Sequence, residues 1–222
     1  MNLCLFDLDH TLLPLDSDHE FGEFLIRVGL ADPVDYRSRN DGFYRQYCEG
    51  TLVLEEYIDF TTSVWRTLSV SDQRDLQQRF MDEVIEPAIQ PQALQLVQDH
   101  RDRGDQIAIV TATNEFVTRP IAEAFGVADL IAVKLVRDAQ GQVTGQIDGV
   151  PSFREGKITR VEQWLAERGQ TLTDFERVSF YSDSPNDLPL LEQATDPVAT
   201  NPSPALEAQA KARGWRLLYL FP

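Results

Sequence analysis

The chain has 222 residues, of which 42% are hydrophobic and 25% charged, and these values are typical of a soluble globular protein with one α/β domain, or with a core and a small inserted domain. They exclude a disordered or collagen-like chain. Acidic residues outnumber basic residues by 36 to 20, which gives a formal net charge of -16, so nucleic acid and anionic membrane are not expected as partners.

The N-terminal residues have no basic region and only a short apolar run, which argues against a signal peptide or a membrane span. The two cysteines, Cys4 and Cys48, are not clustered, and this suits a reducing compartment. We therefore expect a cytoplasmic protein.

Three short apolar runs predict buried strands. They are residues 3–6, 107–110 and 178–181, and their hydrophobicity is continuous, as in parallel strands covered on both faces. Helical patterns cover about residues 93–103, 115–125, 156–168 and 204–213, and a glycine follows each. Strands that alternate with helices predict an α/β fold, a doubly wound, Rossmann-like parallel sheet that binds ligands at the carboxyl ends of its strands.

Residues 15–89 interrupt this alternation, because they are rich in helix formers and aromatic residues and contain no clear strand. We predict that they form an all-helical cap domain over a core made of residues 1–14 and 90–222. Extra helices at the periphery of the sheet are the alternative. Residues 132–148 have two strand-like halves around a polar turn and predict a β-hairpin.

Two carboxylates, Asp7 and Asp9, follow the first predicted strand in a D-x-D-x-T pattern. Residues i and i+2 of an extended chain point the same way, so both can face one site. Two anions this close stay ionised together only where a cation or dense hydrogen bonding offsets them. A turn or helix-capping pair is the alternative interpretation.

Polar residues also follow the other two strands. Asp183 and Asp187 could both approach a hard divalent cation, although Asp183 or Ser184 could instead cap the next helix. Thr111 is expected where a strand gives way to a helix, and free amides at such a junction bind phosphate. An ordinary helix cap is equally compatible with Thr111.

Lys157 is one of only three lysines, against seventeen arginines. A chain that prefers arginine so strongly can retain a lysine where a compact point charge is needed. A solvated lysine at a helix start is the alternative.

The order of these four elements resembles the four motifs of the haloacid dehalogenase superfamily, and the resemblance covers nearly the whole chain. The helical insert and residues 201–215 resemble subfamily IB, the phosphoserine-phosphatase-like branch. The resemblance implies a phosphatase in which Asp7 attacks phosphorus and forms an aspartyl-phosphate, while Asp9 protonates the leaving group and later activates water. It also implies Mg²⁺ as cofactor, held by Asp7, the backbone carbonyl of Asp9 and Asp183, with Asp187 in support, through water or by orienting the ligands. The residues that it implies for binding phosphate are Thr111, Ala112, Lys157 and Asn186, of which Thr111 and Lys157 are also catalytic.

The substrate is expected to be a small phosphate ester. In phosphoserine phosphatases a carboxylate near the position of Asp16 receives the substrate amine, and a cap arginine receives its carboxylate. Here Asp16 and Asp18 lie in an acidic cluster at the start of the cap, and the comparable cap helix has no arginine before Arg66. This favours an amine without a carboxylate, and nearby aromatic residues favour a flat ring. We expect histidinol phosphate ahead of phosphoserine; solvated acids at a helix start are the alternative.

Other functions fit less well. Asp9 argues against dehalogenation, since halide leaves without protonation, whereas a phosphotransferase or phosphomutase of the same fold would keep all four motifs. A receiver domain would lack the D-x-D-x-T motif and the cap, and a catalytically silent binding protein would be expected to have lost a motif residue. Among the histidines, His19 could face the substrate and His100 is expected to be solvated.

Overall fold

A six-stranded parallel sheet forms the centre of the computed structural model, which describes residues 1–221. The strand order is β3-β2-β1-β6-β7-β8, and β4 and β5 form a separate antiparallel hairpin. The strands are β1 (Asn2–Phe6), β2 (Gln106–Asn114), β3 (Asp129–Val133), β4 (Leu135–Arg137), β5 (Val143–Ile147), β6 (Arg177–Ser182), β7 (Asp196–Thr200) and β8 (Arg216–Leu218). The predicted doubly wound α/β fold and the hairpin are confirmed.

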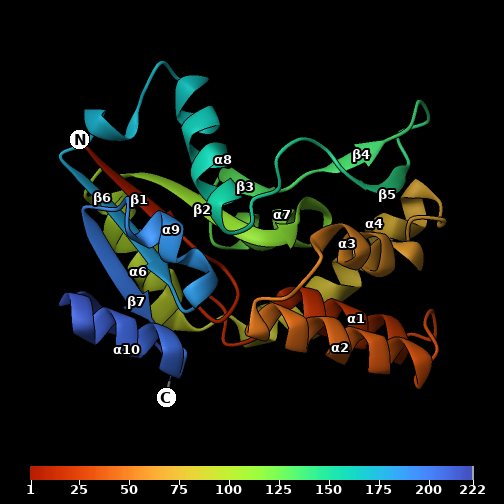
Figure 1. Cartoon of the computed structure of the whole chain (residues 1–222). Helices are drawn as coiled ribbons and strands as arrows, with labels where there is room; N and C mark the ends of the chain where they lie inside the picture. The colour runs from red at the N-terminus through yellow and green to blue at the C-terminus, as the bar shows by residue number, and fades with distance from the viewer. Residues whose placement is uncertain (222) are drawn as a thin grey trace.

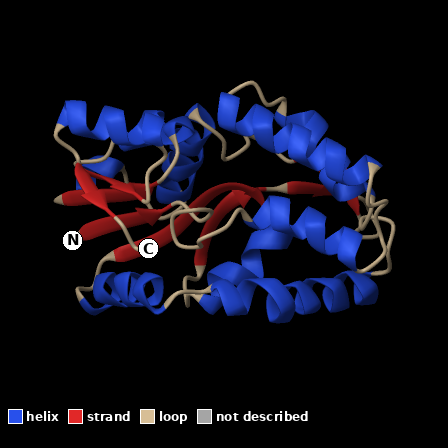
Figure 2. Cartoon of the chain, turned by 90° about the horizontal axis from the view of Figure 1, so that it is seen from below, coloured by secondary structure: helices blue, strands red, loops and turns tan. Residues whose placement is uncertain are grey.

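Helices cover both faces of the sheet (Figure 2). Alternate residues of β1 face opposite sides, so Cys4 and Phe6 pack with α6 and α7, whereas Leu3 and Leu5 pack with α8, α9 and α10. These helices are α6 (Pro91–Asp102), α7 (Glu115–Ala124), α8 (Glu155–Ala166), α9 (Leu188–Leu191) and α10 (Pro204–Arg213), with 3₁₀ turns η2 (Leu172–Asp174) and η3 (Pro185–Asp187). Within residues 1–221, no helix combines the length and the apolar character that a membrane span requires.

The segment between β1 and α6 contains helices and no strand within the described residues. It consists of α1 (Ser17–Arg27), α2 (Asp35–Glu49), α3 (Leu54–Ser63), α4 (Val70–Phe80), the π-helix η1 (Met81–Ile85) and α5 (Glu86–Ala88). Its first four helices lie to one side of the sheet, and the β4–β5 hairpin packs against α3 (Figure 1). The division into a cap of residues 15–89 and a core of residues 1–14 and 90–222 stays a prediction, and residue 222 lies outside the described residues.

Aromatic packing joins this helical segment to the sheet's helices. The buried ring of Trp65 stacks on Phe116 of α7, with ring centroids 4.0 Å apart and planes at 13°. Phe21 of α1 makes edge contacts with Phe80 of α4 and with Phe116. Each fully buried aromatic side chain contributes roughly 1.5–3 kcal/mol, so these contacts fix the segment against the core.

The carboxyl ends of β1, β2 and β6 meet at one edge of the sheet, because Phe6 pairs in register with Ile109 and with Tyr181. Strand β2 is longer than expected and continues past Thr111 to Asn114, which caps α7 by accepting hydrogen bonds from two backbone amides. The prediction that Thr111 marks the junction with the helix is therefore wrong. The added residues pair with β3 beyond an irregularity in register.

Candidate active site

Asp7 is buried at the end of β1, and its backbone N–H donates to the carbonyl oxygen of Tyr181 at 2.9 Å. One carboxylate oxygen accepts a hydrogen bond from Lys157 Nζ at 2.8 Å. The other oxygen lies 3.3 Å from the Thr11 hydroxyl, which also lies 3.4 Å from Asp183. The three predicted residues Asp7, Lys157 and Asp183 are thus brought together from three separate parts of the chain.

Both carboxylate oxygens of Asp9 accept hydrogen bonds. The backbone N–H of Ser17 donates to Oδ1 at 2.8 Å, and the Thr113 hydroxyl donates to Oδ2 at 2.9 Å. The sequence did not predict Thr113, although its position two residues after Thr111 on an extended strand would have indicated the same side of the chain. Burial and then the nearby Asp16 raise the pKa of Asp9 to about 7, although these hydrogen bonds oppose the shift.

The turn after Asp9 is fixed by a residue from the far end of the chain. His10 has a left-handed backbone, with φ 55°. Asn201 Nδ2 lies 3.0 Å from the carbonyl oxygen of His10 and 3.3 Å from that of Thr11. The Tyr44 hydroxyl lies 3.3 Å from His10 Nε2, and therefore links this turn to α2.

Lys157 is 1% exposed and lies between two carboxylates, so it is not a solvated helix-start lysine. Its Nζ is 2.8 Å from Asp7 and 2.7 Å from Oδ1 of Asp187. The Ser182 hydroxyl donates to Asp187 at 2.7 Å and helps to orient it. Burial alone would lower the pKa of Lys157, but Asp187 and Asp7 outweigh it and raise the pKa above its ordinary value.

Negative charge is in excess around Lys157. The carboxylates of Asp7 and Asp187 pair with this one ammonium group, and Asp183 lies near Asp7, with the Thr11 hydroxyl close to both. Burial raises the pKa of Asp7 to about 7 despite Lys157. Burial and then Asp7 raise the pKa of Asp183 well above its usual range. Asp7 is therefore not ionised at neutral pH simply because carboxyl groups have a low pKa; it needs further positive charge nearby. A hard divalent cation would supply that charge, because it prefers anionic oxygen ligands.

The side chain of Asn186 is directed to the helical segment. Its Nδ2 donates to the carbonyl oxygen of Tyr47, near the C-terminus of α2, at 3.1 Å. Ser184 caps the following 3₁₀ turn by accepting from the Asn186 backbone N–H, so the helix-cap interpretation of this motif also holds. The motif serves both purposes, because Ser184 caps the turn while Asp187 pairs with Lys157.

A cavity of about 550 Å³, which includes space open to solvent, adjoins Asp7 and Asp9. At its base are Asp7, Asp9, Thr111, Ala112 and Thr113, and Thr111 is buried. Its walls include the aromatic side chains of Phe43, Tyr44, Tyr47, Tyr57 and Phe153. The cavity therefore has a polar base at the sheet edge and walls that come mainly from the helical segment.

The two acidic residues predicted to bind substrate both line this cavity, but they differ in environment. Asp16 caps α1, accepting hydrogen bonds from the backbone N–H groups of Asp18 and His19. Asp18 is 5% exposed, and its nearest side-chain amide is Asn114 Nδ2 at 3.5 Å. Burial, Asp16 and Asp9 raise the pKa of Asp18 well above its ordinary value, against a hydrogen bond with Tyr57.

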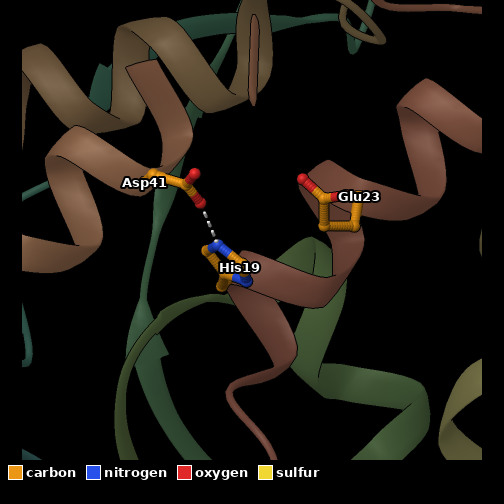
Figure 3. A group of neighbouring side chains, drawn as sticks. All are labelled: His19, Glu23 and Asp41. Carbon is orange, nitrogen blue, oxygen red and sulfur yellow. Dashed lines mark hydrogen bonds and ion pairs between the residues drawn. The ribbon is translucent and has the colours of Figure 1, made fainter. Parts of the chain in front are cut away.

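His19, Glu23 and Asp41 form a second group beside the cavity (Figure 3). Their potential ligand atoms lie within 4.8 Å of one another, and His19 Nε2 is 3.0 Å from Asp41 Oδ1. Arg37, however, bonds to both carboxylate oxygens of Glu23, at 3.1 and 3.0 Å. Because these oxygens are already paired, we assign no metal to this group; His19 itself lines the cavity, as its position after the acidic cluster suggested.

The prediction that His100 is solvated is wrong. His100 is 2% exposed; its Nδ1 lies 2.7 Å from Asp105, and its Nε2 lies 2.8 Å from the Tyr181 hydroxyl. The sequence neighbours of His100 are polar, so its burial could not be recognised from them. His100 lies on the one face of α6 that is buried against the sheet.

Comparison with known proteins agrees with this geometry. The model of the haloacid dehalogenase-like hydrolase family matches residues 4–192. A histidinol-phosphatase of Neisseria meningitidis serogroup C (strain 8013) is 42% identical, over 98% of each chain. A protein of unknown function from Bordetella pertussis Tohama I is 50% identical, with a TM-score of 0.94 over 99% of both chains.

A substrate-bound phosphoserine phosphatase has the same fold, with a TM-score of 0.67 and 20% identity over 97% of this chain and 91% of that one. The family, the fold and the phosphatase activity predicted from the sequence are confirmed. This chain belongs to the haloacid dehalogenase-like hydrolases, and within them it is a phosphatase.

Proposed function

We propose that this phosphatase hydrolyses histidinol phosphate, a small phosphate ester with an amine, a flat imidazole ring and no carboxylate. The observation that carries the proposal is the buried carboxylate of Asp18 in a cavity whose lining, among residues 1–221, contains no lysine or arginine. A buried carboxylate is costly unless it gains a cation or a proton. A substrate ammonium group would supply that cation.

The rest of the cavity supports the same substrate. Aromatic walls offer faces on which a flat ring can stack. The cap arginine Arg66 bonds to Asp59 and does not line the cavity, and Arg45 is also absent from the lining. A substrate carboxylate would therefore meet acidic residues and no positive partner within the described lining, which disfavours phosphoserine. The name of the Neisseria relative agrees with this choice.

The chemistry that we propose divides hydrolysis into two steps. A carboxylate oxygen of Asp7 attacks phosphorus, the bond from phosphorus to the ester oxygen breaks, and Asp9 gives its proton to the leaving oxygen. Water then attacks the aspartyl-phosphate, Asp9 takes up a proton, and inorganic phosphate leaves with Asp7 restored. Thr111 and the backbone at Ala112 would hold the phosphoryl oxygens, and Lys157 would offset their charge.

We further propose that Mg²⁺ is the cofactor. The carboxylates of Asp7 and Asp183, with the backbone carbonyl of Asp9, would hold it, and Asp187, which pairs with Lys157, would support it through water. The excess of buried negative charge at Asp7 and Asp183 supports this assignment. When bound, the ion would polarise the phosphoryl group and offset its charge. The free thiols of Cys4 and Cys48 are consistent with a cytoplasmic enzyme.

Steady-state kinetics on histidinol phosphate, phosphoserine and p-nitrophenyl phosphate test the substrate. We expect the highest kcat/KM for histidinol phosphate. Asp18→Asn should lower that value by about 10–100-fold, the usual contribution of a hydrogen bond to a charged group, and should change p-nitrophenyl phosphate hydrolysis little. Asp59→Asn is the control, since Asp59 lies on α3 and pairs with Arg66 outside the cavity lining. A higher kcat/KM for phosphoserine would contradict the proposal.

A further inference from the structure

The C-terminal end of α2 lies against two loops of the core, one just before Lys157 and one just before Asp187. Helix α2 ends at Glu49, and the C-cap residue Gly50 has a left-handed backbone with φ 71°. The guanidinium of Arg154 donates to the carbonyl oxygen of Gly50, and Asn186 donates to that of Tyr47. A Cβ atom added at Gly50 would lie 3.3 Å from Arg154 Nη2 and 3.9 Å from Asn186 Oδ1, so the three residues converge on one point.

The two donors come from the loops that position the phosphate site. Arg154 precedes α8, and its carbonyl oxygen accepts the backbone N–H of Lys157 at 3.0 Å. Asn186 directly precedes Asp187, the second carboxylate that binds Lys157. Each core loop thus donates one hydrogen bond to the carbonyl end of the same helix, where the helix dipole favours a positive group such as Arg154.

The contacts also complete the wall of the cavity. The Arg154 guanidinium lies 4.7 Å from the centroid of the Phe153 ring, and the ring of Phe153 lies 6.2 Å from that of Tyr47. Phe153 and Tyr47 both line the cavity. The same short stretch of α2 therefore presents its carbonyl groups to the core loops and a side chain to the substrate space.

The backbone of Arg154 supports a role for its side chain. With φ 51° and ψ -124°, it has a conformation that glycine adopts far more readily than a residue with a side chain. The next glycine, Gly156, cannot carry a Cβ, because that atom would lie 2.1 Å from the Pro151 carbonyl oxygen, so the loop is tightly constrained. An arginine at the left-handed position is costly to the fold, and its cation and hydrogen bond are the features that glycine could not replace.

We propose that Arg154 is a positioning residue which, together with Asn186, forms a latch that holds the C-terminus of α2 over the phosphate site. The latch keeps Tyr47 against Phe153 and so maintains the cavity in which the phosphate ester binds. This inference holds for any phosphate ester that enters the cavity and does not depend on histidinol phosphate as the substrate.

The substitution Arg154→Gly removes the guanidinium without straining the fold, because glycine adopts this backbone conformation readily. It therefore tests the latch apart from the stability of the protein. We expect the midpoint of thermal unfolding to stay at or above the wild-type value. With p-nitrophenyl phosphate and Mg²⁺, KM should rise at least about fivefold with kcat within about twofold of wild type, since the lost contact affects binding before and during the chemical step alike. In Arg154→Lys, which keeps one charged donor, KM should lie between the values of wild type and Arg154→Gly.

Hydrogen exchange measured by mass spectrometry provides a structural readout of the same variants. The backbone N–H groups of Gly50 and Thr51 bond to the carbonyl oxygens of Tyr47 and Gln46, and in Arg154→Gly they should exchange faster while peptides of α7 remain unchanged. Arg119→Ala is the matched control, since Arg119 on α7 also donates to a backbone carbonyl, that of Ala128 at 2.9 Å. A normal KM and normal exchange in Arg154→Gly would overturn the latch. So would a loss of kcat with unchanged KM, or equal effects in Arg119→Ala.

Discussion

Lys157 Nζ donates to Oδ1 of Asp7 at 2.8 Å, across 150 positions of sequence. The contact joins the first residue after β1 to the first turn of α8, and both side chains are buried. Burial raises the pKa of Asp7, Lys157 lowers it and Asp187 raises it, and the balance is a pKa of about 7. The proposed nucleophile is thus poised between its ionised and protonated forms until further positive charge reaches the site.

The first prediction concerns this nucleophile. Asp7→Asn removes the attacking oxygen anion but keeps the shape of the side chain, so the protein should fold and lose essentially all phosphatase activity. Circular dichroism checks the fold, and phosphate release from p-nitrophenyl phosphate measures the activity. Substantial turnover by a folded sample that mass spectrometry shows to be free of deamidation would argue against Asp7.

The second prediction concerns Asp9 as the proton donor. In the free enzyme its raised pKa, about 7, keeps the acid form available below that pH, so kcat/KM for alkyl phosphates should fall as the pH rises through about 7. Asp9→Asn should lower kcat by about 10²–10⁴-fold for alkyl phosphates and less for p-nitrophenyl phosphate, whose leaving group needs less protonation. Equal losses for the two classes, measured from pH 5 to 9, would contradict this role.

Three of the six strands of the sheet, β1, β2 and β6, could be predicted from the sequence because they lie in its buried centre, whereas β3, β7 and β8 were not predicted. The runs before Asp7 and Asp183 were located within a residue or two, whereas β2 continues to Asn114. The reason is that Thr111, Thr113 and Asn114 are polar, and strand pairing at this edge is governed by β3 and by contacts with Asp9 and α7. Polar residues that meet tertiary partners are not distinguishable from a loop in a single sequence.

The site was predicted best where polar residues directly follow a predicted strand or begin a predicted helix. Asp7, Asp183 and Lys157 followed from their order and their positions at strand or helix ends, while the burial of His100 and the contact from Asn186 to Tyr47 did not. Both depend on how separate helices pack, and one sequence contains no direct signal for contacts between distant helices. The aromatic walls were suggested by composition alone.

The third prediction concerns the metal. Asp183→Ala should abolish Mg²⁺-dependent activity, because it removes an anionic oxygen ligand. A chelator should abolish wild-type activity as well, and added Mg²⁺ should restore it. Isothermal titration with Mg²⁺ gives a readout apart from turnover, and full activity in excess chelator would contradict the assignment.

The same substitution, Asp183→Ala, should not destabilise the metal-free protein. Asp183 lies among like charges, and burial and Asp7 raise its pKa, so its ionised form is unfavourable in the folded state. Asp183→Ala should therefore leave the free energy of unfolding in chelator unchanged or higher at pH 8. Urea denaturation checks this, and a clear loss of stability would indicate that the surrounding charge is already compensated.

The last prediction concerns the pH dependence of stability at His100. Burial lowers the pKa of His100 below its ordinary value of 6.5, although the hydrogen bond with Asp105 opposes the shift. Above about pH 6.5 neither the folded nor the unfolded state protonates this ring, so it contributes no pH dependence there. Below that value the unfolded chain binds a proton that the folded protein resists, and the free energy of unfolding falls as the pH decreases toward the folded pKa.

His100→Gln isolates this contribution, because many acidic groups of the chain titrate over the same range and their effects cancel in the difference between the two proteins. Glutamine can keep one hydrogen bond but cannot take up a proton, so the variant should be less stable than wild type at pH 7.5, by about 1–3 kcal/mol for disturbed buried polar contacts. The difference in free energy of unfolding between the two proteins should narrow between pH 6.5 and 5, since only wild type loses the histidine contribution. Urea denaturation at several pH values measures both curves, and a difference that widens on acidification would mean that the folded protein binds the proton more tightly than the unfolded chain does.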